Sequence, residues 1–372
     1  MTCQTVAMDD TRAATTRAVT IYDVARAAGV APSTVSRAFS RPGRVNAATA
    51  ERIRTVADDL GYRTNPLARA LSTARTQMIA LMVSDVGNPF YAEVIRGAQT
   101  AASAGGSTIL LVDAQESGRR ERAALERLLP TVDGVVLAGT RMADSAIRMI
   151  AKQKPVIVLN RAVVDVPSVV TDNARGARLA VEHLAGLGHE SLAYAAGPEA
   201  SWADSKRWQS LRDSAGELDL RIRRLGPFSP DLRGGLRAAD ALVGQPATAV
   251  VAYNDQVAIG LVRGLTGLGR RVPEDVSVIG FDNIDAAGLV TPGLTTVAAP
   301  LRVEGRSAVE HLLAMIAGGA PGVGRSMVLP VRLVVRESTG QRSRNNTSPA
   351  SGTTNVSPSA RKASRSTAAG SR

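Results

Sequence analysis

Apolar residues recur with the period of an α-helix near the start of the chain. Four of them share one face of a first short helix: Ile21, Val24, Ala25 and Ala28. Gly29 ends this helix, because glycine adopts the left-handed backbone there at little cost. Pro32 suits the first turn of a second helix, where its missing N–H group would have had no partner. The pattern predicts two short helices joined by a tight turn.

The second helix is expected to present one polar side. Ser33, Thr34 and Arg37 share this side, whereas Val35 and Ala38 turn inward. A small helix that carries short hydroxyl groups and an arginine fits the major groove of DNA. The spacing favours a helix-turn-helix over the alternative, an ordinary helical hairpin with a solvated polar face.

A third helix follows and is expected to begin at Asn46 or Ala47. Its buried stripe is predicted from four apolar residues: Ile53, Val56, Ala57 and Leu60. Gly61 ends this helix, and a short helical segment that begins with a proline comes directly afterwards. Three helices of this size predict a small head at the N-terminal end of the chain.

From Met78 onward the pattern changes to alternating strands and helices. The first set of elements is expected at strands 78–83, 108–112, 134–138 and 156–159 and helices 90–104, 117–129 and 143–152. The second set begins after Asp172, with helices 174–187, 203–216, 231–243 and 255–268 and strands 191–196, 221–225, 248–252 and 276–280. Repeated units of this kind form doubly wound parallel sheets, so two sets predict an α/β body of two lobes with a cleft between them.

The basic charge of the chain lies outside this body. The 372 residues carry a net charge of +12, of which residues 19–76 hold +5 and residues 341–372 hold +6. The part between them is nearly neutral, which is typical of a DNA-binding head on a neutral body. The C-terminal segment contains no leucine, so it cannot form a heptad helix, and we expect it to be disordered. Its charge either adds non-specific DNA affinity or has no function.

Composition excludes several other classes of protein. Cys3 is the single cysteine and the three histidines are widely spaced, so we expect no disulfide framework, metal site or cofactor. No apolar run approaches the roughly 20 residues of a membrane span, and residues 1–19 do not resemble a signal peptide. The common phosphate-binding, dinucleotide-binding and serine-nucleophile motifs are absent from the sequence. We therefore expect a cytoplasmic protein that is not an enzyme and has no contact with a membrane.

Four short runs of sequence are more specific. They are Ile-Tyr-Asp-Val-Ala from residue 21, Ser-Thr-Val-Ser-Arg from residue 33, Leu-Gly-Tyr from residue 60 and Asn-Pro-Leu-Ala-Arg-Ala-Leu from residue 65. Together they resemble the lactose-repressor (LacI/GalR) family of bacterial transcription regulators. The resemblance extends to Val-Arg-Glu-Ser-Thr at residues 335–339. It implies a three-helix helix-turn-helix head and a body like a periplasmic sugar-binding protein, in which the chain crosses between lobes near residues 171, 300 and 325.

The resemblance also implies a hinge helix at residues 65–73 that orders on operator DNA. Leu71 matches the family's leucine that wedges into a base step of the minor groove, at a cost of a few kcal/mol that added contacts offset. The alternative is a plain core leucine, but Arg69 and the short basic surroundings argue against it. Nine residues are predicted to contact DNA: Thr20, Tyr22, Ser33, Thr34, Ser36, Arg37, Asn46, Arg69 and Leu71.

A ligand of the body is expected outside the carboxyl ends of the strands. A carboxylate can accept hydrogen bonds from neighbouring hydroxyl groups, an amide donates and accepts, and an aromatic ring covers the apolar face of a sugar. Residues of these types, and two arginines, follow the predicted strands. Seven are predicted to bind the effector: Phe90, Tyr91, Asn160, Arg161, Arg207, Asn254 and Asp282. The resemblance implies effector contacts for four of them: Phe90, Arg207, Asn254 and Asp282.

Other polar residues near these positions have structural interpretations. Asp255 is expected to cap a helix, and Asn88 and Asp172 are expected to serve as turn and cap residues. Trp208 follows Arg207 where the family has glycine, so it belongs either to the core or to the cleft wall. Ala31 stands where the family usually has serine, which removes a side-chain cap from the second helix.

These features predict a homodimeric, sequence-specific DNA-binding regulator, a repressor that reads a pseudo-palindromic operator. A small effector, a sugar, would control its operator affinity from the cleft. The alternatives are a cytosolic solute receptor without a DNA role, which residues 20–71 argue against, and an enzyme on a doubly wound fold. We divide the chain into a tail (1–18), a DNA-binding head (19–64), a hinge and linker (65–76), the two-lobed body (77–340) and a basic tail (341–372).

Overall fold

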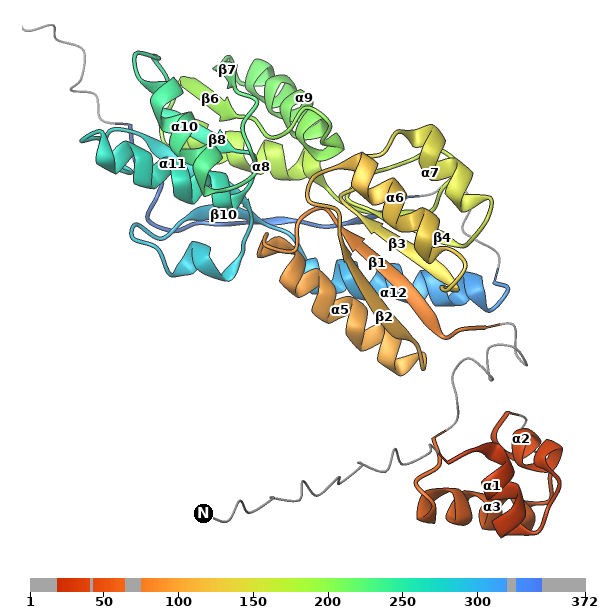
Figure 1. The fold of residues 1–372 in the computed structure, drawn as a ribbon. Helices are drawn as coiled ribbons and strands as arrows, with labels where there is room; N and C mark the ends of the chain where they lie inside the picture. The colour runs from red at the N-terminus through yellow and green to blue at the C-terminus, as the bar shows by residue number, and fades with distance from the viewer. Residues whose placement is uncertain (1–18, 41–42, 64–74, 320–325, 343–372) are drawn as a thin grey trace, which may run out of the picture.

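A computed structural model describes residues 19–40, 43–63, 75–319 and 326–342 of the chain (Figure 1). The predicted hinge helix, with Arg69 and Leu71, lies outside these residues, as do both predicted tails apart from Gln341 and Arg342. No helix among the described residues is long and apolar enough to cross a membrane. The described parts are a three-helix head and a two-lobed α/β body, as the pattern of the sequence predicts.

The head consists of α1 (Ile21–Ala28), α2 (Pro32–Ser40) and α3 (Ala47–Asp59). Thr20 and Asp23 form a capping box at the start of α1, and Gly29 ends the helix with a left-handed φ of 65°. The three helices bury a shared core that includes Val24, Val35 and Ile53. The predicted turn between α1 and α2 is therefore confirmed.

One detail of the third helix was predicted wrongly. Ile53 and Ala57 are buried as expected, but Leu60 is 40% exposed. The reason is geometric, because Leu60 is the C-terminal cap of α3 and stands where the helix passes beyond its two partners. Tyr62 instead closes this end of the core against Phe39, with the ring centroids 5.9 Å apart.

The first lobe is built on a parallel sheet of six strands in the order β11-β5-β4-β3-β1-β2. The strands are β1 (Met78–Val83), β2 (Thr108–Asp113), β3 (Gly134–Ala138), β4 (Val156–Leu159), β5 (Ser168–Thr171) and β11 (Ser326–Leu329). Helices α5 (Phe90–Ala104) and α12 (Leu301–Ile316) cover one face, and α6 (Gly118–Leu128) and α7 (Asp144–Ala151) cover the other. Gly97 and Gly305 let α5 and α12 approach closely, because a Cβ at either position would strike a backbone carbonyl of the other helix.

The second lobe repeats this arrangement with strand order β12-β10-β9-β8-β6-β7, in which β12 alone is antiparallel to its neighbour. The strands are β6 (Ser191–Ala195), β7 (Arg221–Leu225), β8 (Ala249–Ala252), β9 (Ser277–Asp282), β10 (Thr295–Ala298) and β12 (Arg332–Val334). Helices α8 (Asn173–Gly186) and α9 (Trp202–Glu217) cover one face, and α10 (Leu232–Leu242) and α11 (Asp255–Gly267) cover the other.

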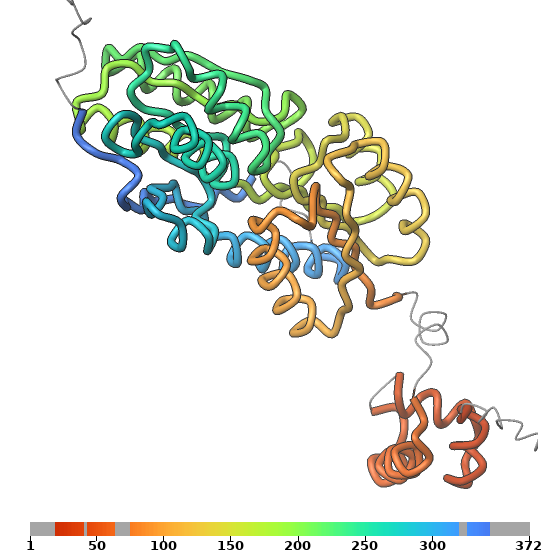
Figure 2. Tube along the Cα trace, turned by 60° about the vertical axis from the view of Figure 1, so that its left-hand side comes forward, coloured from red at the N-terminus to blue at the C-terminus, as the bar shows by residue number. Residues whose placement is uncertain are grey.

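The chain passes between the lobes three times. The first two crossovers join β5 to α8 and β10 to α12, near residues 171 and 300 as expected. The third joins β11 to β12 at residues 330–331, some way beyond the expected position near 325. In Figure 2 the light-blue segment that follows the second lobe lies against the orange helix α5 of the first. The chain that returns from the second lobe therefore completes the helix layer of the first.

Candidate DNA interface and effector cleft

The polar side of α2 is open to solvent in the head. Ser33 and Arg37 are exposed, Thr34 and Ser36 are half-buried, and Tyr22 on α1 is 65% exposed. Val35 and Ala38 point into the core, so the predicted orientation of α2 is confirmed. The guanidinium of Arg37 makes no ion pair with any residue that the structure describes. Its role at DNA therefore stays a prediction.

Two other predicted DNA contacts are also helix caps. The Thr20 hydroxyl donates to Asp23 Oδ2 over 2.7 Å, and Asn46 Oδ1 accepts from the backbone N–H of Ala48 over 2.9 Å. The Asn46 amide nitrogen stays exposed, so capping leaves its donors available. A structural role for both side chains is thus established, and their role at DNA stays a prediction, as it does for Arg69 and Leu71 outside the described residues.

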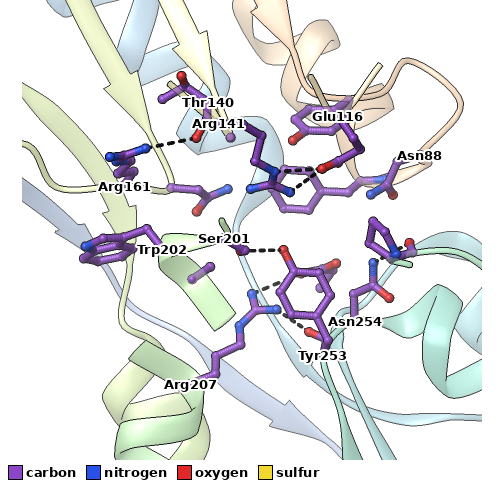
Figure 3. A pocket seen from close by; sticks show the side chains of 17 residues that line it. Asn88, Glu116, Thr140, Arg141, Arg161, Ser201, Trp202, Arg207, Tyr253 and Asn254 are labelled. Carbon is purple, nitrogen blue, oxygen red and sulfur yellow. Dashed lines mark hydrogen bonds and ion pairs between the residues drawn. The ribbon is translucent and has the colours of Figure 1, made fainter. Parts of the chain in front are cut away.

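All seven residues predicted to bind the effector line one cleft between the lobes (Figure 3). Four of them come from the first lobe: Phe90, Tyr91, Asn160 and Arg161. Three come from the second lobe: Arg207, Asn254 and Asp282. The side chains leave a cavity of only about 40 Å³, room for very few water molecules. A sugar therefore requires the lobes or the side chains to move apart.

Arg207 occupies the second-lobe side of the cleft and is held from several directions. Its Nε donates to Asn173 Oδ1 over 2.9 Å, and a terminal nitrogen donates to the backbone carbonyl of Tyr253. The guanidinium lies 4.3 Å from the centroid of the Phe281 ring, and its other terminal nitrogen is 3.5 Å from Asp282 Oδ1. Arg207 lies in the second turn of α9, which begins at Trp202.

Asp282 is the last residue of β9, not a residue beyond it, since the strand ends two residues later than predicted. Its backbone adopts a φ of 109°, an unusual conformation for an aspartate, and its side chain is buried. Burial raises the pKa of the carboxyl to about 7, although Arg207 acts in the opposite direction. Strain and desolvation at one carboxyl are typical of a ligand-binding position.

Asp255 does not cap α11, contrary to prediction. Asn254 is the cap, and its Oδ1 accepts from the N–H of Val257 while its amide donates to the carbonyl of Pro230. Asp255 is fully buried and accepts from the Ile284 N–H and, over 2.6 Å, from the Thr296 hydroxyl. Its carboxylate therefore joins α11 to the loop after β9, and burial raises its pKa.

The other polar and aromatic residues near the cleft have structural roles or line its wall. Asn88 accepts from the Phe90 N–H and Asp172 caps α8, so the turn and cap roles of both are confirmed. Trp208 stacks on Tyr194 with ring centroids 6.0 Å apart and belongs to the core. Trp202, one helical turn and a half earlier, lines the cleft instead.

The first-lobe wall contains charged residues that the sequence analysis missed. Arg141 pairs with Glu116 at 2.7 Å, and both line the cleft (Figure 3). Arg161, which was predicted, binds Asp144 and the carbonyls of Thr140 and Met142. Arg141 could have been predicted, because it follows β3 and ligands of such folds bind outside the carboxyl ends of strands. Glu116 lies in a loop whose sequence has no recognisable pattern.

Comparison with known proteins identifies the family of this chain. Residues 20–65 match the model of the bacterial regulatory proteins, lacI family, and residues 181–339 match a periplasmic binding protein-like domain. The repressor CytR of Escherichia coli K12 is 33% identical over 332 residues, which cover 87% of this chain and 96% of that protein. This chain belongs to the lacI family. The regulator DegA of Bacillus subtilis is 34% identical over 86% of this lacI-family chain.

Solved structures of regulators support the same family assignment. A lac repressor dimer bound to operator and an anti-inducer matches this lacI-family protein with a TM-score of 0.79 at 26% identity, over 87% of this chain and all of that one. The regulator CelR in complex with cellobiose matches with a TM-score of 0.65 at 30% identity, over 86% of this chain and 99% of that one. The protein is thus a bacterial transcription regulator with a DNA-binding head.

Proposed function

We propose that this regulator is a homodimeric repressor whose affinity for a pseudo-palindromic operator is controlled by a small sugar-like effector in the cleft. The observation that carries the proposal is the convergence of all seven predicted effector residues, from both lobes, on one cleft. Among similar structures, one regulator holds cellobiose and another, from Enterococcus faecalis, holds ribose. Such a regulator acts where the chromosome lies, in the cytoplasm, and needs no catalytic group.

On the DNA side, we assign residues 19–64 to a head that reads one half-site. Ser33, Thr34, Ser36 and Arg37 on α2 would face the major groove, with Arg37 donating to a guanine. One such helix buries too little surface for tight binding, so two heads of a dimer would read two half-sites. Residues 65–76 would link each head to the body (77–340), and sedimentation that shows a stable monomer on operator DNA would contradict this assembly.

On the effector side, Asp282 and Arg207 would supply an acceptor and donors for neighbouring hydroxyl groups. Both are buried and held in place before a ligand arrives, which lowers the cost of ordering them. Asn160 would add an amide, and the Phe90 ring would cover an apolar face of the sugar. Asn254 is already engaged as a helix cap, so its contribution would come through the remaining lone pair of its amide oxygen.

A thermal-shift screen of free sugars and nucleosides tests the proposal. A ligand at 100 times its dissociation constant stabilises the folded protein by about 2.7 kcal/mol, a readily measured shift. The screen is repeated with operator DNA present, and we expect the same compound to change operator affinity. If no compound stabilises the protein, or if one does so without any effect on DNA binding, the proposed control by a sugar-like effector is wrong.

A further inference from the structure

Glu304 on α12 is a buried carboxyl for which the proposed function has no use. Its side chain is fully shielded from solvent, and neither carboxyl oxygen has a hydrogen-bond partner among the described residues. A buried polar group without a partner costs free energy that a leucine of similar size in the same place would not. The cost calls for a compensating role, and such groups cluster at functional sites.

The position of Glu304 relates it to the effector cleft. It lies in the first turn of α12, just after the second crossover between the lobes, and its N–H donates to the carbonyl of Pro300. Burial, together with the nearby Asp282, raises the pKa of its carboxyl to about 8, while Arg207 and the Asn160 side chain act in the opposite direction. The influence of these three residues, all of which line the cleft, places Glu304 directly behind its wall.

The other elements packed against α12 offer Glu304 no alternative partner. Strands β3, β4 and β5 carry no titratable side chain. Helix α5 contributes Tyr91, which donates to Ser84, and Glu93, which pairs with Arg96 and Arg302 at the surface. Asp255 is near Asp282, but its carboxylate is satisfied by Ile284 and Thr296. Among the described residues, Asn160 is the neutral side chain with a marked influence on the Glu304 carboxyl.

Asn160 lines the cleft and also lies close enough to Glu304 to influence its carboxyl. Its backbone is fixed directly after β4, with a φ of 55° and its N–H donating to the carbonyl of Val169. Its amide stabilises the ionised form of Glu304, yet the two groups are not aligned in a hydrogen bond. A small rotation of either side chain would bring them together and would decide which end of the amide points into the cleft.

We propose that Glu304 is a positioning residue of the effector site, whose carboxyl group behind the cleft wall fixes which end of the Asn160 amide faces the effector. The inference rests on the proposed function and deepens it. A neutral Glu304 donates its O–H to Asn160 Oδ1, so that the Nδ2 group donates to an effector oxygen. An ionised Glu304 accepts from Nδ2 and turns Oδ1 towards the cleft.

The orientation of the Asn160 amide predicts which kind of effector atom binds beside it. While Glu304 is neutral, Asn160 offers donors, so it selects an effector atom that accepts a hydrogen bond. A ring oxygen or a carbonyl oxygen, which can only accept, would be favoured at this point. Above the pKa of Glu304 the preference reverses, and an effector of that kind would bind less tightly.

The test compares Glu304→Gln and Glu304→Leu with the wild-type protein, with D-ribose, cellobiose and adenosine as probes. Glutamine retains a donor towards Asn160 at every pH, whereas leucine provides no hydrogen bond. We expect Glu304→Gln to bind the best probe within about twofold of wild type near pH 6.5 and to lose the weakening that wild type shows towards pH 9. Glu304→Leu should bind about tenfold more weakly, as for one lost hydrogen bond, while its Tm is equal or higher.

Glu310→Gln and Glu310→Leu are the matched controls, since Glu310 lies on the same helix but is exposed and pairs only with Arg306. They should leave probe affinity and its pH dependence unchanged. If Glu304→Leu binds the probe as well as wild type does, the positioning role is wrong, although the cleft still binds its effector. If no probe binds even the wild-type protein, the proposed function fails and this inference fails with it.

Discussion

The head and the cleft present their functional side chains in opposite ways. On α2 of the head, Ser33 and Arg37 stand exposed, and Arg37 has no ion-pair partner among the described residues. In the cleft, Arg207 and Asp282 are buried, paired with each other and held by further contacts. Exposed side chains can contact a long, charged duplex directly. A site for a small molecule must instead hold its side chains in place before the ligand arrives, in a region of low dielectric.

The contrast predicts that loss of a buried, paired side chain of the cleft destabilises the protein, whereas loss of an exposed side chain on α2 does not. Arg207→Ala should have the largest effect, about 3–5 kcal/mol of unfolding free energy, because it removes the ion-pair partner of the buried Asp282 and the donor to Asn173 and the Tyr253 carbonyl. Urea unfolding measures the loss. Arg178→Ala is the control, since Arg178 pairs with Glu217 at the surface and its loss should change the free energy of unfolding little. Similar losses for both variants would remove the contrast.

Asp282→Asn tests the chemistry of the cleft with little change of shape. We expect effector binding to weaken by about 1.5–3 kcal/mol, as for a lost hydrogen bond to a charged group. The carboxyl has a pKa of about 7, and effector hydroxyl groups donate to its ionised form. Wild-type affinity should therefore rise as pH increases through about 7, with a proton released on binding, and calorimetry should find this rise missing in Asp282→Asn. A rise that persists in the variant would assign the titration to another group.

Arg37→Ala tests the head. It should weaken operator binding by about 1–3 kcal/mol, have little effect on random DNA and leave the free energy of unfolding unchanged. Fluorescence titration of operator and random duplexes measures both. Arg54→Ala provides a comparison, because Arg54 is exposed on α3 and pairs with Glu51. An equal loss on both duplexes would show that Arg37 contacts phosphate rather than a base.

Leu71→Ala tests whether head and cleft communicate through residues 65–73. The family resemblance assigns Leu71 to the minor groove, and coupling between two sites is typically about 1–3 kcal/mol. We expect weaker operator binding and a smaller effector response together, with effector affinity of the free protein unchanged. The measurement is a titration of labelled operator with and without effector. A variant that keeps the full effector response would show that this segment does not couple the two sites.

Asn46→Ala should have the smallest effect. Loss of the cap on α3 should cost about 1 kcal/mol of stability, since Asn46 Oδ1 accepts from the Ala48 N–H. Asn46→Ser keeps a capping oxygen and serves as the control for stability. If the serine variant is stable but binds operator as weakly as the alanine variant, the amide also contacts DNA; equal operator binding by all three proteins would leave Asn46 with its cap alone.

Most of the fold and much of the cleft could be predicted from local patterns, but the elements where the lobes join could not. Strands β5, β10, β11 and β12 have only three or four residues, and β11 pairs with β5, more than 150 residues earlier. Their short apolar runs carry no period that distinguishes them from loops. Helix α12 was missed as well, although its first turn carries the buried Glu304.

The sequence alone determined the helix-turn-helix, the alternation of strands and helices, and the seven cleft residues that follow strand ends, because each depends on neighbours a few residues away. The tertiary structure decided which charged groups are buried, which are paired and which have a shifted pKa. Glu304 has the pattern of a solvated residue near a helix start, yet packing of α12 against the first lobe buries both of its oxygens. Desolvation, pairing and a raised pKa depend on what surrounds a group in space, and only the folded chain brings Asp282, Arg207 and Asn160 beside it.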